Sequence, residues 1–499
     1  MGYNGACMKK SGGQKRKLIS CLLLACLLMG CASKGAASAN NDNTLTSVPE
    51  KTAMLAEART EYKVPESYPA VSVDLIGYTV GTEKKAVIRA KELPKTFVLK
   101  NAVSGEKVFE GKVKPIEDAD SEGMCVGVAD FSEIDEEGTY YIETEYLGDS
   151  KEFKIKTGVY DELLSRTFGK LHAMRANTEY GTKSVPAPGN SDLLLDVSGG
   201  WKTGENGEKD VVTGCMAAYD LMMAYQYHPS SFGDDMGISE SGNRIPDILD
   251  EIMFETDWLL KMQNPETGGV YTAVSSRKTS TGRFEPTIDG EATRATVYFC
   301  VVMTHFSYVI NKFNSAYASK CLKAAGLAWK CLEANKNLVS SEQMYRAAVE
   351  LYKATGYAVY KKVIDEYLKS NADKDLTDRT MVDAAITHMS TTRNADMDLC
   401  GKLMERFMAR THSKAAEARD CGYMVESADM TPEELLRNTE ELVVVDYIIS
   451  SLEYEKMEEN YLHYMCGRNI KSELYLDFEY NPDGYAMLLV LLGRLTDKK

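Results

Sequence analysis

A change in apolar periodicity near Tyr160 is the feature that most constrains the fold of this 499-residue chain. From Tyr160 onward, apolar residues recur at i, i+3, i+4 and i+7, which is the pattern of amphipathic helices. The pattern predicts helices over 160–174, 212–227, 245–263, 293–312, 316–334, 341–355, 358–369, 379–390, 396–409, 432–453, 456–466 and 483–496, with almost no strand signal. Twelve helices pair into six hairpins, so we expect an all-α domain of the (α/α)6-barrel type over residues 159–499.

Before Tyr160 the pattern changes to short alternating segments. Turn signals such as Ser104-Gly105 and Glu137-Gly138 separate them. The predicted strands cover 71–78, 84–90, 95–101, 106–113, 124–131, 138–145 and 151–156. Seven short strands at this spacing indicate an immunoglobulin-like (Ig-like) β-sandwich, which we place at residues 67–158.

The N-terminus has the features of an export signal. Basic residues within 9–17 precede an apolar run, 18–30, that is too short to span a bilayer. Leu28-Met29-Gly30 ahead of Cys31 resembles a bacterial lipoprotein cleavage box, and Cys26 is a second candidate for the lipid-bearing cysteine. We therefore predict a signal peptide over 1–30, a flexible tether over 31–66 and a lipid anchor at Cys31 on an exported membrane surface. An ordinary secretory signal is the alternative.

Charge and cysteine usage narrow the class of partner. A formal net charge of −16 repels phosphate, which excludes nucleic acid as a partner, whereas a neutral glucan is compatible with it. Eight cysteines follow Cys31 without any C-x-x-C pair, and six histidines are scattered without metal-ligand spacing. We therefore predict no metal site and no cofactor, and leave disulfide pairing and calcium on loop carboxylates open.

One stretch, residues 198–228, is similar to the signature of glycoside hydrolase family 9, the cellulase family. The family pattern Gly-Gly-Trp-x-Asp-Ala-Gly-Asp-Tyr-Gly-Lys-Tyr-Val-Val is kept here at Gly199, Gly200, Trp201, Lys209, Val211 and Val212. The runs 246–251 (PDILDE), 258–263 (WLLKMQ) and 268–271 (GGVY) resemble the family's next helix and turn, and residues 71–155 resemble its N-terminal Ig-like module. The resemblance covers roughly residues 71–499. It implies a hydrolase of β-glucan or cellulose-type polysaccharide that inverts the anomeric centre, and family relatives often carry calcium. Separately, we expect the chain to be a monomer.

The same alignment shows that the catalytic aspartates are replaced. They fall on Thr203 and Asn206, whose hydroxyl and amide groups cannot take a proton from water near neutral pH. Glu205 and Asp210 are the candidates for a relocated base, with Glu208 between them. A solvated loop face is the alternative interpretation of these acids, because a displaced carboxylate usually points elsewhere.

The resemblance places the general acid at Glu479, with Glu473 as a rival in a shifted register. We expect Phe478 and Tyr480 to give Glu479 an apolar environment, which would raise its pKa as an acid requires. The family's long loop with a His-Arg pair is missing, since only nine residues separate Asn469 from Glu479. Part of the sugar-binding cleft is therefore expected to be absent or rebuilt.

Aromatic side chains complete the predicted site. Trp201 and Tyr271 are the candidates for stacking on sugar faces, whereas Trp258 and Trp329 lie on apolar helix faces and are expected in the core. Two hypotheses follow. The first is a divergent glycoside hydrolase with weak activity, and the alternative is a non-catalytic glycan-binding or scaffold lipoprotein descended from such an enzyme.

Overall fold

The computed structural model describes residues 68–116, 123–176, 184–374 and 378–496. The described residues all belong to one compact unit, which spans 66–499. The predicted signal peptide and the whole predicted tether, including Cys31, lie outside the described residues. Within the described part of the chain, no helix combines the length and the apolar character that a membrane crossing requires.

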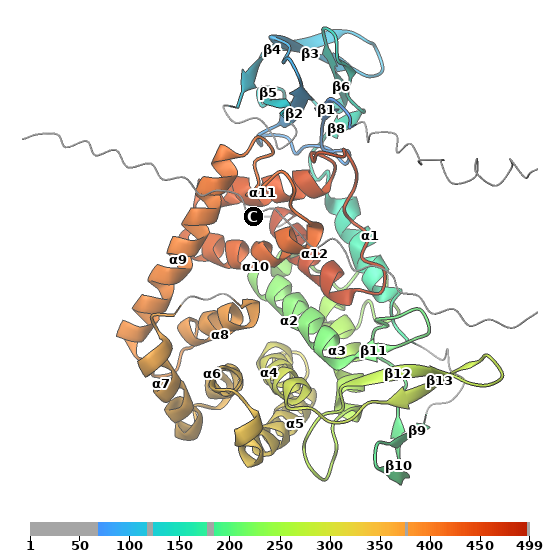
Figure 1. The fold of residues 1–499 in the computed structure, drawn as a ribbon, viewed down its shortest axis with the longest axis vertical. Coiled ribbons are helices and arrows are strands. Elements are labelled where there is room, and N and C mark those ends of the chain that lie inside the picture. Colours follow the sequence, from blue (N-terminus) through green and yellow to red (C-terminus); the bar gives the residue numbers. More distant parts are fainter. Residues whose placement is uncertain (1–67, 117–122, 177–183, 375–377, 497–499) are drawn as a thin grey trace, which may run out of the picture. The chain divides into compact units, whose positions relative to one another are not determined.

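The first part of the compact unit is an antiparallel β-sandwich (Figure 1). Its strands are β1 (Val71–Ser72), β2 (Lys85–Ala90), β3 (Thr96–Asn101), β4 (Lys107–Pro115), β5 (Cys125–Asp130), β6 (Gly138–Thr144), β7 (Gly148–Asp149) and β8 (Phe153–Ile155). They are ordered β1-β2-β5-β4-β3-β6-β7, with β8 paired to β6. Alternate residues of β6 are buried, and the Tyr78 ring packs edge-on against Phe131 and Phe153 in the core.

Twelve helices follow among the described residues, which confirms the predicted fold class. They are α1 (Asp161–His172), α2 (Val211–Tyr227), α3 (Asp247–Lys261), α4 (Thr293–Ile310), α5 (Ser315–Ala334), α6 (Ser341–Thr355), α7 (Ala358–Asn371), α8 (Arg379–Met389), α9 (Met397–Asp420), α10 (Pro432–Ile449), α11 (Leu452–Met465) and α12 (Pro482–Leu495). The even-numbered helices form the inner layer: α12 packs on α2 and α10, and α2, α4, α6 and α8 pack on one another in that order. Helices α2 and α12 are buried on nearly all sides, as expected for helices inside a barrel.

Five short strands also lie in this helical part, where the sequence indicated almost none. Strands β9 (Ser184–Ala187) and β10 (Asn190–Asp196) form a hairpin, and β11 (Lys209–Asp210), β12 (Ala273–Lys278) and β13 (Phe284–Ile288) form a three-stranded sheet. These strands were not predicted because their residues lack apolar alternation. Strand β11 leads directly into α2, which places this small sheet at the N-terminal end of an inner helix.

Candidate active site

The N-terminal ends of the inner helices supply the candidate site. Successive helices of hairpins run in opposite directions, so the even-numbered helices run the same way and begin at the same end of the barrel. A cavity of about 530 Å³ opens there, lined by residues at or just before the starts of three of these helices: Arg294 of α4, Glu342 of α6 and Asp378 before α8. Tyr298, Tyr345 and Tyr367 add aromatic surface to the same cavity.

The loop over residues 201–210 leads into α2 at this end. Lys209 is buried, and its ammonium group donates a hydrogen bond to the Gly199 carbonyl at 2.7 Å. The Thr203 amide donates to the Glu208 carbonyl at 2.7 Å, and the Thr203 hydroxyl donates to the same oxygen at 3.3 Å. These bonds close residues 203–208 into a compact turn.

Glu208 lies at the centre of this turn. Its carboxylate accepts hydrogen bonds from the Asn206 amide N–H at 2.9 Å, from the Asn206 side chain at 3.3 Å and from the Ser276 hydroxyl on β12. Burial acts to raise the pKa of Glu208, but these hydrogen bonds outweigh it and hold the pKa below its ordinary value. A Cβ atom at Gly204 would lie 2.4 Å from Glu208 Oε2, so a larger residue there would displace the Glu208 carboxylate from this position. The turn therefore holds an ionised carboxylate, the state that a general base requires.

The structure does not support Asp210 as a relocated base. Asp210 is the N-cap of α2, and its Oδ1 accepts hydrogen bonds from the Thr213 amide at 2.8 Å and the Thr213 hydroxyl at 2.9 Å. A carboxylate that satisfies the free N–H groups of a helix start is fixed in a structural role. The loop carries three acids, Glu205, Glu208 and Asp210. Glu205 and Asp210 were the preferred candidates from the sequence, whereas the structure singles out Glu208.

Glu479 lies on the segment that enters α12, and its side chain is exposed. The predicted apolar environment is absent, because Phe478 is buried edge-on against Tyr485. The pKa of the Tyr480 hydroxyl is raised by burial and then by the charges of Glu479 and Glu205, so both carboxylates lie near this phenol. Glu205 is exposed, as is the rival Glu473, whose backbone is held by Asn469.

Trp201 and Tyr271 do not offer stacking platforms. Their exposed fractions are 1% and 3%, so neither ring presents a face to a ligand, and the prediction for both is wrong on this point. The Trp201 indole N–H donates to Glu251 Oε1 at 2.7 Å, and its backbone N–H donates to Glu255 Oε2 at 2.7 Å. Trp201 therefore positions the loop. Trp258 and Trp329 are buried as expected.

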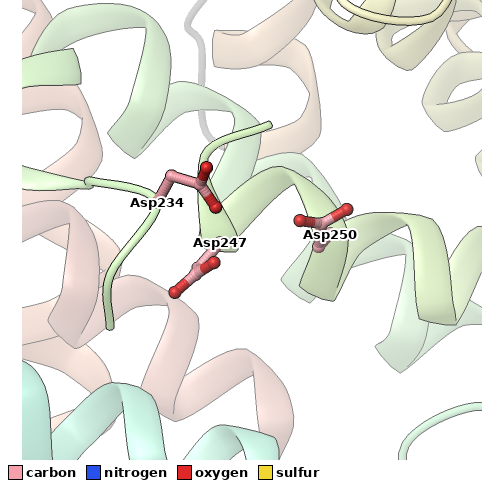
Figure 2. A group of neighbouring side chains, drawn as sticks. All are labelled: Asp234, Asp247 and Asp250. Atoms are coloured by element: carbon pink, nitrogen blue, oxygen red, sulfur yellow. The ribbon is translucent and has the colours of Figure 1, made fainter. Parts of the chain in front are cut away.

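Three aspartates gather close to the start of α3. One ligand oxygen from each of Asp234, Asp247 and Asp250 lies within 4.8 Å of the others, and the three side chains converge on one region (Figure 2). The sequence indicated no metal site, because its histidines and cysteines lack metal-ligand spacing. These carboxylates come from a loop and a helix, so only the fold brings them together.

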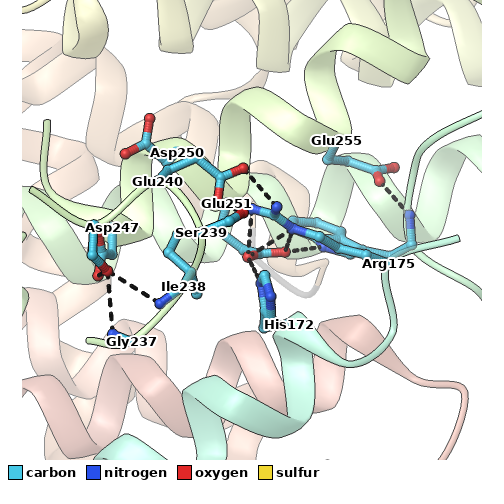
Figure 3. Close-up of polar contacts among 12 residues, drawn as sticks. His172, Arg175, Gly237, Ile238, Ser239, Glu240, Asp247, Asp250, Glu251 and Glu255 are labelled. Atoms are coloured by element: carbon cyan, nitrogen blue, oxygen red, sulfur yellow. Dashed lines mark hydrogen bonds and ion pairs between the residues drawn. The ribbon is translucent and has the colours of Figure 1, made fainter. Parts of the chain in front are cut away.

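Helix α3 also fixes the loop that leads to Glu208. Glu251 is fully buried and accepts hydrogen bonds from Arg175 Nε at 3.0 Å and from Trp201, while His172 Nδ1 lies 2.9 Å from its other oxygen (Figure 3). A Cβ atom at Gly200 would lie 2.6 Å from the Trp258 ring, which explains the second glycine of the Gly-Gly-Trp run. The motif is therefore a packing and hydrogen-bonding device that positions residues 203–208.

Comparisons with known proteins agree with this architecture. Residues 161–481 match the model of glycosyl hydrolase family 9, and residues 66–149 match that of the cellulase N-terminal Ig-like domain. Endoglucanase D of Acetivibrio thermocellus is 26% identical over 308 residues, covering 56% of this chain and 49% of the relative. A xyloglucan-specific endo-beta-1,4-glucanase of Bacteroides ovatus is 26% identical over 352 residues, covering 59% of each chain. The chain thus spans about half the length of the curated relatives it matches.

Solved structures share the fold. A metagenome-derived family 9 endoglucanase superposes with a TM-score of 0.74 at 20% identity, covering 86% of this chain and 99% of that chain. A Bacteroides ovatus family 9 structure gives a TM-score of 0.72 at 19% identity, covering 86% of this chain and 99% of that chain. The chain therefore shares its fold, a sandwich followed by a helical barrel, with solved family 9 structures.

Proposed function

Because the chain belongs to glycosyl hydrolase family 9, we propose that it hydrolyses a β-glucan with inversion, at low turnover, using Glu479 as general acid and Glu208 as general base. The observation that carries this proposal is the Glu208 carboxylate, held ionised at the centre of the loop by Asn206 and Ser276. Relatives named as endoglucanases and as a xyloglucan-specific endo-beta-1,4-glucanase support a β-glucan as the substrate class.

The proposed reaction divides the work between two carboxyl groups. Glu208 takes a proton from water as the water oxygen forms a bond to the anomeric carbon, and Glu479 gives its proton to the glycosidic oxygen as the C–O bond breaks. An inverting enzyme needs about 6.5–9.5 Å between these groups, which leaves room for the water. Low turnover follows from Thr203 and Asn206, which replace the two carboxylates of the family pattern with groups that cannot accept the proton.

The test is release of reducing sugar from a panel of β-glucans and hemicelluloses. Glu208→Gln and Glu479→Gln are each expected to lower the rate by a factor of about 10²–10⁴, the usual contribution of a positioned acid or base. Glu205→Gln is the matched control, because Glu205 is an exposed acid of the same loop. Loss of activity in Glu205→Gln with full activity in Glu208→Gln would make Glu205 the base instead.

Glycan binding without hydrolysis is the second candidate function. The replacements at Thr203 and Asn206 favour it, as does the short segment between Asn469 and Glu479, which leaves no room for the family's His-Arg loop. Saturable binding of a β-glucan by a wild-type chain that releases no reducing sugar would establish this function and rule out the hydrolase.

We further propose that the protein is an exported lipoprotein anchored through Cys31 to a membrane surface. The apolar run over 18–30 and the Leu28-Met29-Gly30 box support this location. Cys31→Ser is expected to move the protein from the membrane fraction to the soluble fraction of fractionated cells. Cys26→Ser is the control, and a Cys31→Ser protein that stays in the membrane fraction would contradict the anchor site.

A further inference from the structure

Two arginines line the cavity at the starts of the inner helices. Arg294 lies in the first turn of α4, and Arg346 lies in the second turn of α6. Arg346 is 6% exposed, but none of its guanidinium nitrogens is fully enclosed, so they open onto the cavity. Across the described parts of the chain, neither guanidinium forms an ion pair or a hydrogen bond. A buried guanidinium normally has acceptors for its N–H donors, so the lack of them at Arg346 calls for a ligand.

The Tyr298 ring holds both guanidinium groups at one part of the cavity. The guanidinium carbon of Arg346 lies 4.3 Å from the centre of this ring, and that of Arg294 lies 5.7 Å from it. Both distances are in the range of a cation–π contact, which orients a guanidinium while leaving the N–H donors on its edge free. Two positive charges beside one ring repel each other, and an anion that accepts from both would relieve this repulsion.

The acidic side chains of the cavity are engaged elsewhere. Asp378 is the N-cap of α8, and its Oδ1 accepts hydrogen bonds from the Thr380 amide at 2.8 Å and from the Thr380 hydroxyl at 2.6 Å. Hydrogen bonding by its own amide and by neighbouring serines, together with the charge of Lys374, holds the pKa of Glu342 below its ordinary value. The positive charge of the two arginines is therefore left for a ligand.

We propose that this cavity binds the carboxylate of a uronic acid residue in the glycan, with Arg346 and Arg294 as the donors. The inference rests on the proposed function, because it names the sugar class that the same site accepts. The planar fork of a guanidinium matches a carboxylate with two parallel N–H···O bonds. Tyr367 lines the same cavity, is half-buried and stacks on Tyr345 with ring centres 4.5 Å apart, so it offers a fixed ring to the sugar.

The charge of the whole chain limits how many anionic groups the ligand can carry. A formal net charge of −16 repels a polymer with an anionic group on every unit. A glycan with occasional uronic acids presents one carboxylate at a time, and two arginines suffice for it. The chemistry of the cavity therefore favours a mostly neutral glycan with acidic residues at intervals.

The proposed subsite is close to the loop that carries Glu208. Burial, followed by the charges of Glu255 and Asp210, raises the pKa of the Cys215 thiol on α2, and the charge of Arg346 acts in the opposite direction. Arg346 is thus within electrostatic range of the start of α2, the helix that this loop enters. The two arginines are therefore placed to determine which glycan the site accepts.

Calorimetric titration of the full chain, purified in mild detergent, tests the subsite with two matched disaccharides. One is cellobiose, and the other is cellobiose whose non-reducing residue is oxidised from a primary alcohol to a carboxylate, so they differ in this group alone. We expect the acidic disaccharide to bind the wild type about tenfold or more tightly, because it adds charge-assisted hydrogen bonds to arginine.

Methionine variants remove each guanidinium and keep an apolar stem of similar length. Arg346→Met is expected to reduce the preference for the acidic disaccharide to within about twofold, and Arg294→Met to reduce it several-fold. The melting temperature of each variant reports whether it is folded. Arg294 is exposed, so Arg294→Met tests the proposal even where Arg346→Met does not fold.

Arg166→Met is the matched control. Arg166 is an exposed arginine of α1 that does not line the cavity, so this variant removes one positive charge and should keep the wild-type preference. The proposal is overturned if the wild type shows no saturable binding of the acidic disaccharide or binds both disaccharides equally. It is also overturned if Arg346→Met and Arg294→Met both keep the preference. Tighter binding of cellobiose sulfated at the same position would assign the cavity to a sulfate ester instead.

The titration separates this inference from the proposed function, because it measures binding without turnover. A wild type that prefers the acidic disaccharide but releases no reducing sugar from any glycan supports the subsite and removes only the hydrolase. A wild type that hydrolyses a neutral β-glucan and shows no preference between the two disaccharides removes only the subsite.

Discussion

At the scale of single residues, the carboxyl groups of this protein serve different purposes according to their hydrogen-bond partners. Asp210 caps a helix, whereas Glu208 receives three hydrogen bonds and stays ionised. Glu255 is buried without an ion-pair partner among the described residues, and burial raises its pKa to about 8. Its Oε2 accepts the Trp201 amide while Oε1 has no partner, so Glu255 is protonated at neutral pH.

This protonation makes stability depend on pH. Between the unfolded pKa of 4.5 and the folded pKa of about 8, the native chain holds the Glu255 proton and the unfolded chain does not. Raising the pH through this window therefore favours unfolding by about 1.4 kcal/mol per pH unit. Glu255→Gln mimics the protonated form, so its free energy of unfolding should lack this decline. Urea unfolding of both proteins at pH 5, 6, 7 and 8 measures the difference, and parallel pH profiles would contradict the assignment.

At the scale of elements, the loop over residues 201–210 is held from two sides. Helix α3 holds its start through Glu251 and Glu255, and β12 holds its end through Ser276 and the pairing of Lys209 with Val274. Thr203 and Asn206, at which we expect the family's aspartates, lie inside this frame. The hydrogen bonds of the frame therefore hold the turn in place from both ends.

Restoring the family's residues within this frame should restore turnover. The variant Thr203→Asp, Asn206→Asp and Glu208→Gly supplies the two carboxylates and removes the one that would crowd them, and its rate of reducing-sugar release should exceed that of wild type by a factor on the order of 100. The same variant with Glu208 retained should gain less, because three neighbouring carboxylates cannot all ionise.

Glu479→Gln added to the triple variant is the control and should abolish the gain. A triple variant no faster than wild type, with an unchanged melting temperature, would place the defect in the short segment after Asn469, where we expect the family's His-Arg loop to be absent, instead of in the turn.

At the scale of the whole compact unit, sandwich and barrel residues share a buried polar cluster. Asp74 Oδ2 accepts a hydrogen bond from the Tyr160 hydroxyl at 2.9 Å and lies 2.8 Å from His463 Nδ1. The Leu75 amide donates to the Cys466 carbonyl at 2.8 Å. Asp74 and His463 are both buried, so these contacts tie strand-region residues to α1 and to the end of α11.

We expect Asp74→Asn to destabilise both parts together. The change weakens a charge-assisted hydrogen bond in a buried site, which costs about 2 kcal/mol in free energy of unfolding. Urea unfolding followed by tyrosine and tryptophan fluorescence and by far-ultraviolet circular dichroism should show one shifted transition. Asp149→Asn, on the exposed strand β7, should change stability by no more than about 0.5 kcal/mol. Separate transitions for sheet and helix in the wild type would show that the two parts unfold independently.

The sequence by itself determined the order of the two domains and the position of nearly every helix. Helical periodicity is a local property, and each predicted segment overlaps its helix, although α9 continues to Asp420, beyond the predicted end at 409. The family motif likewise marked the turn over residues 203–208 as the candidate site, because its glycines and Trp201 stand at fixed spacing. These features could be predicted because they depend on neighbours a few residues away.

Only the tertiary structure decided what the residues of the site do. Trp201 became a buried anchor because Glu251 and Glu255, some 50 residues further along, accept its hydrogen bonds. Glu208 was distinguished from Glu205 and Asp210 by Ser276, which lies on a strand without apolar alternation. The state of a carboxyl group depends on burial and on donors that are distant in the sequence, and folding alone brings these together.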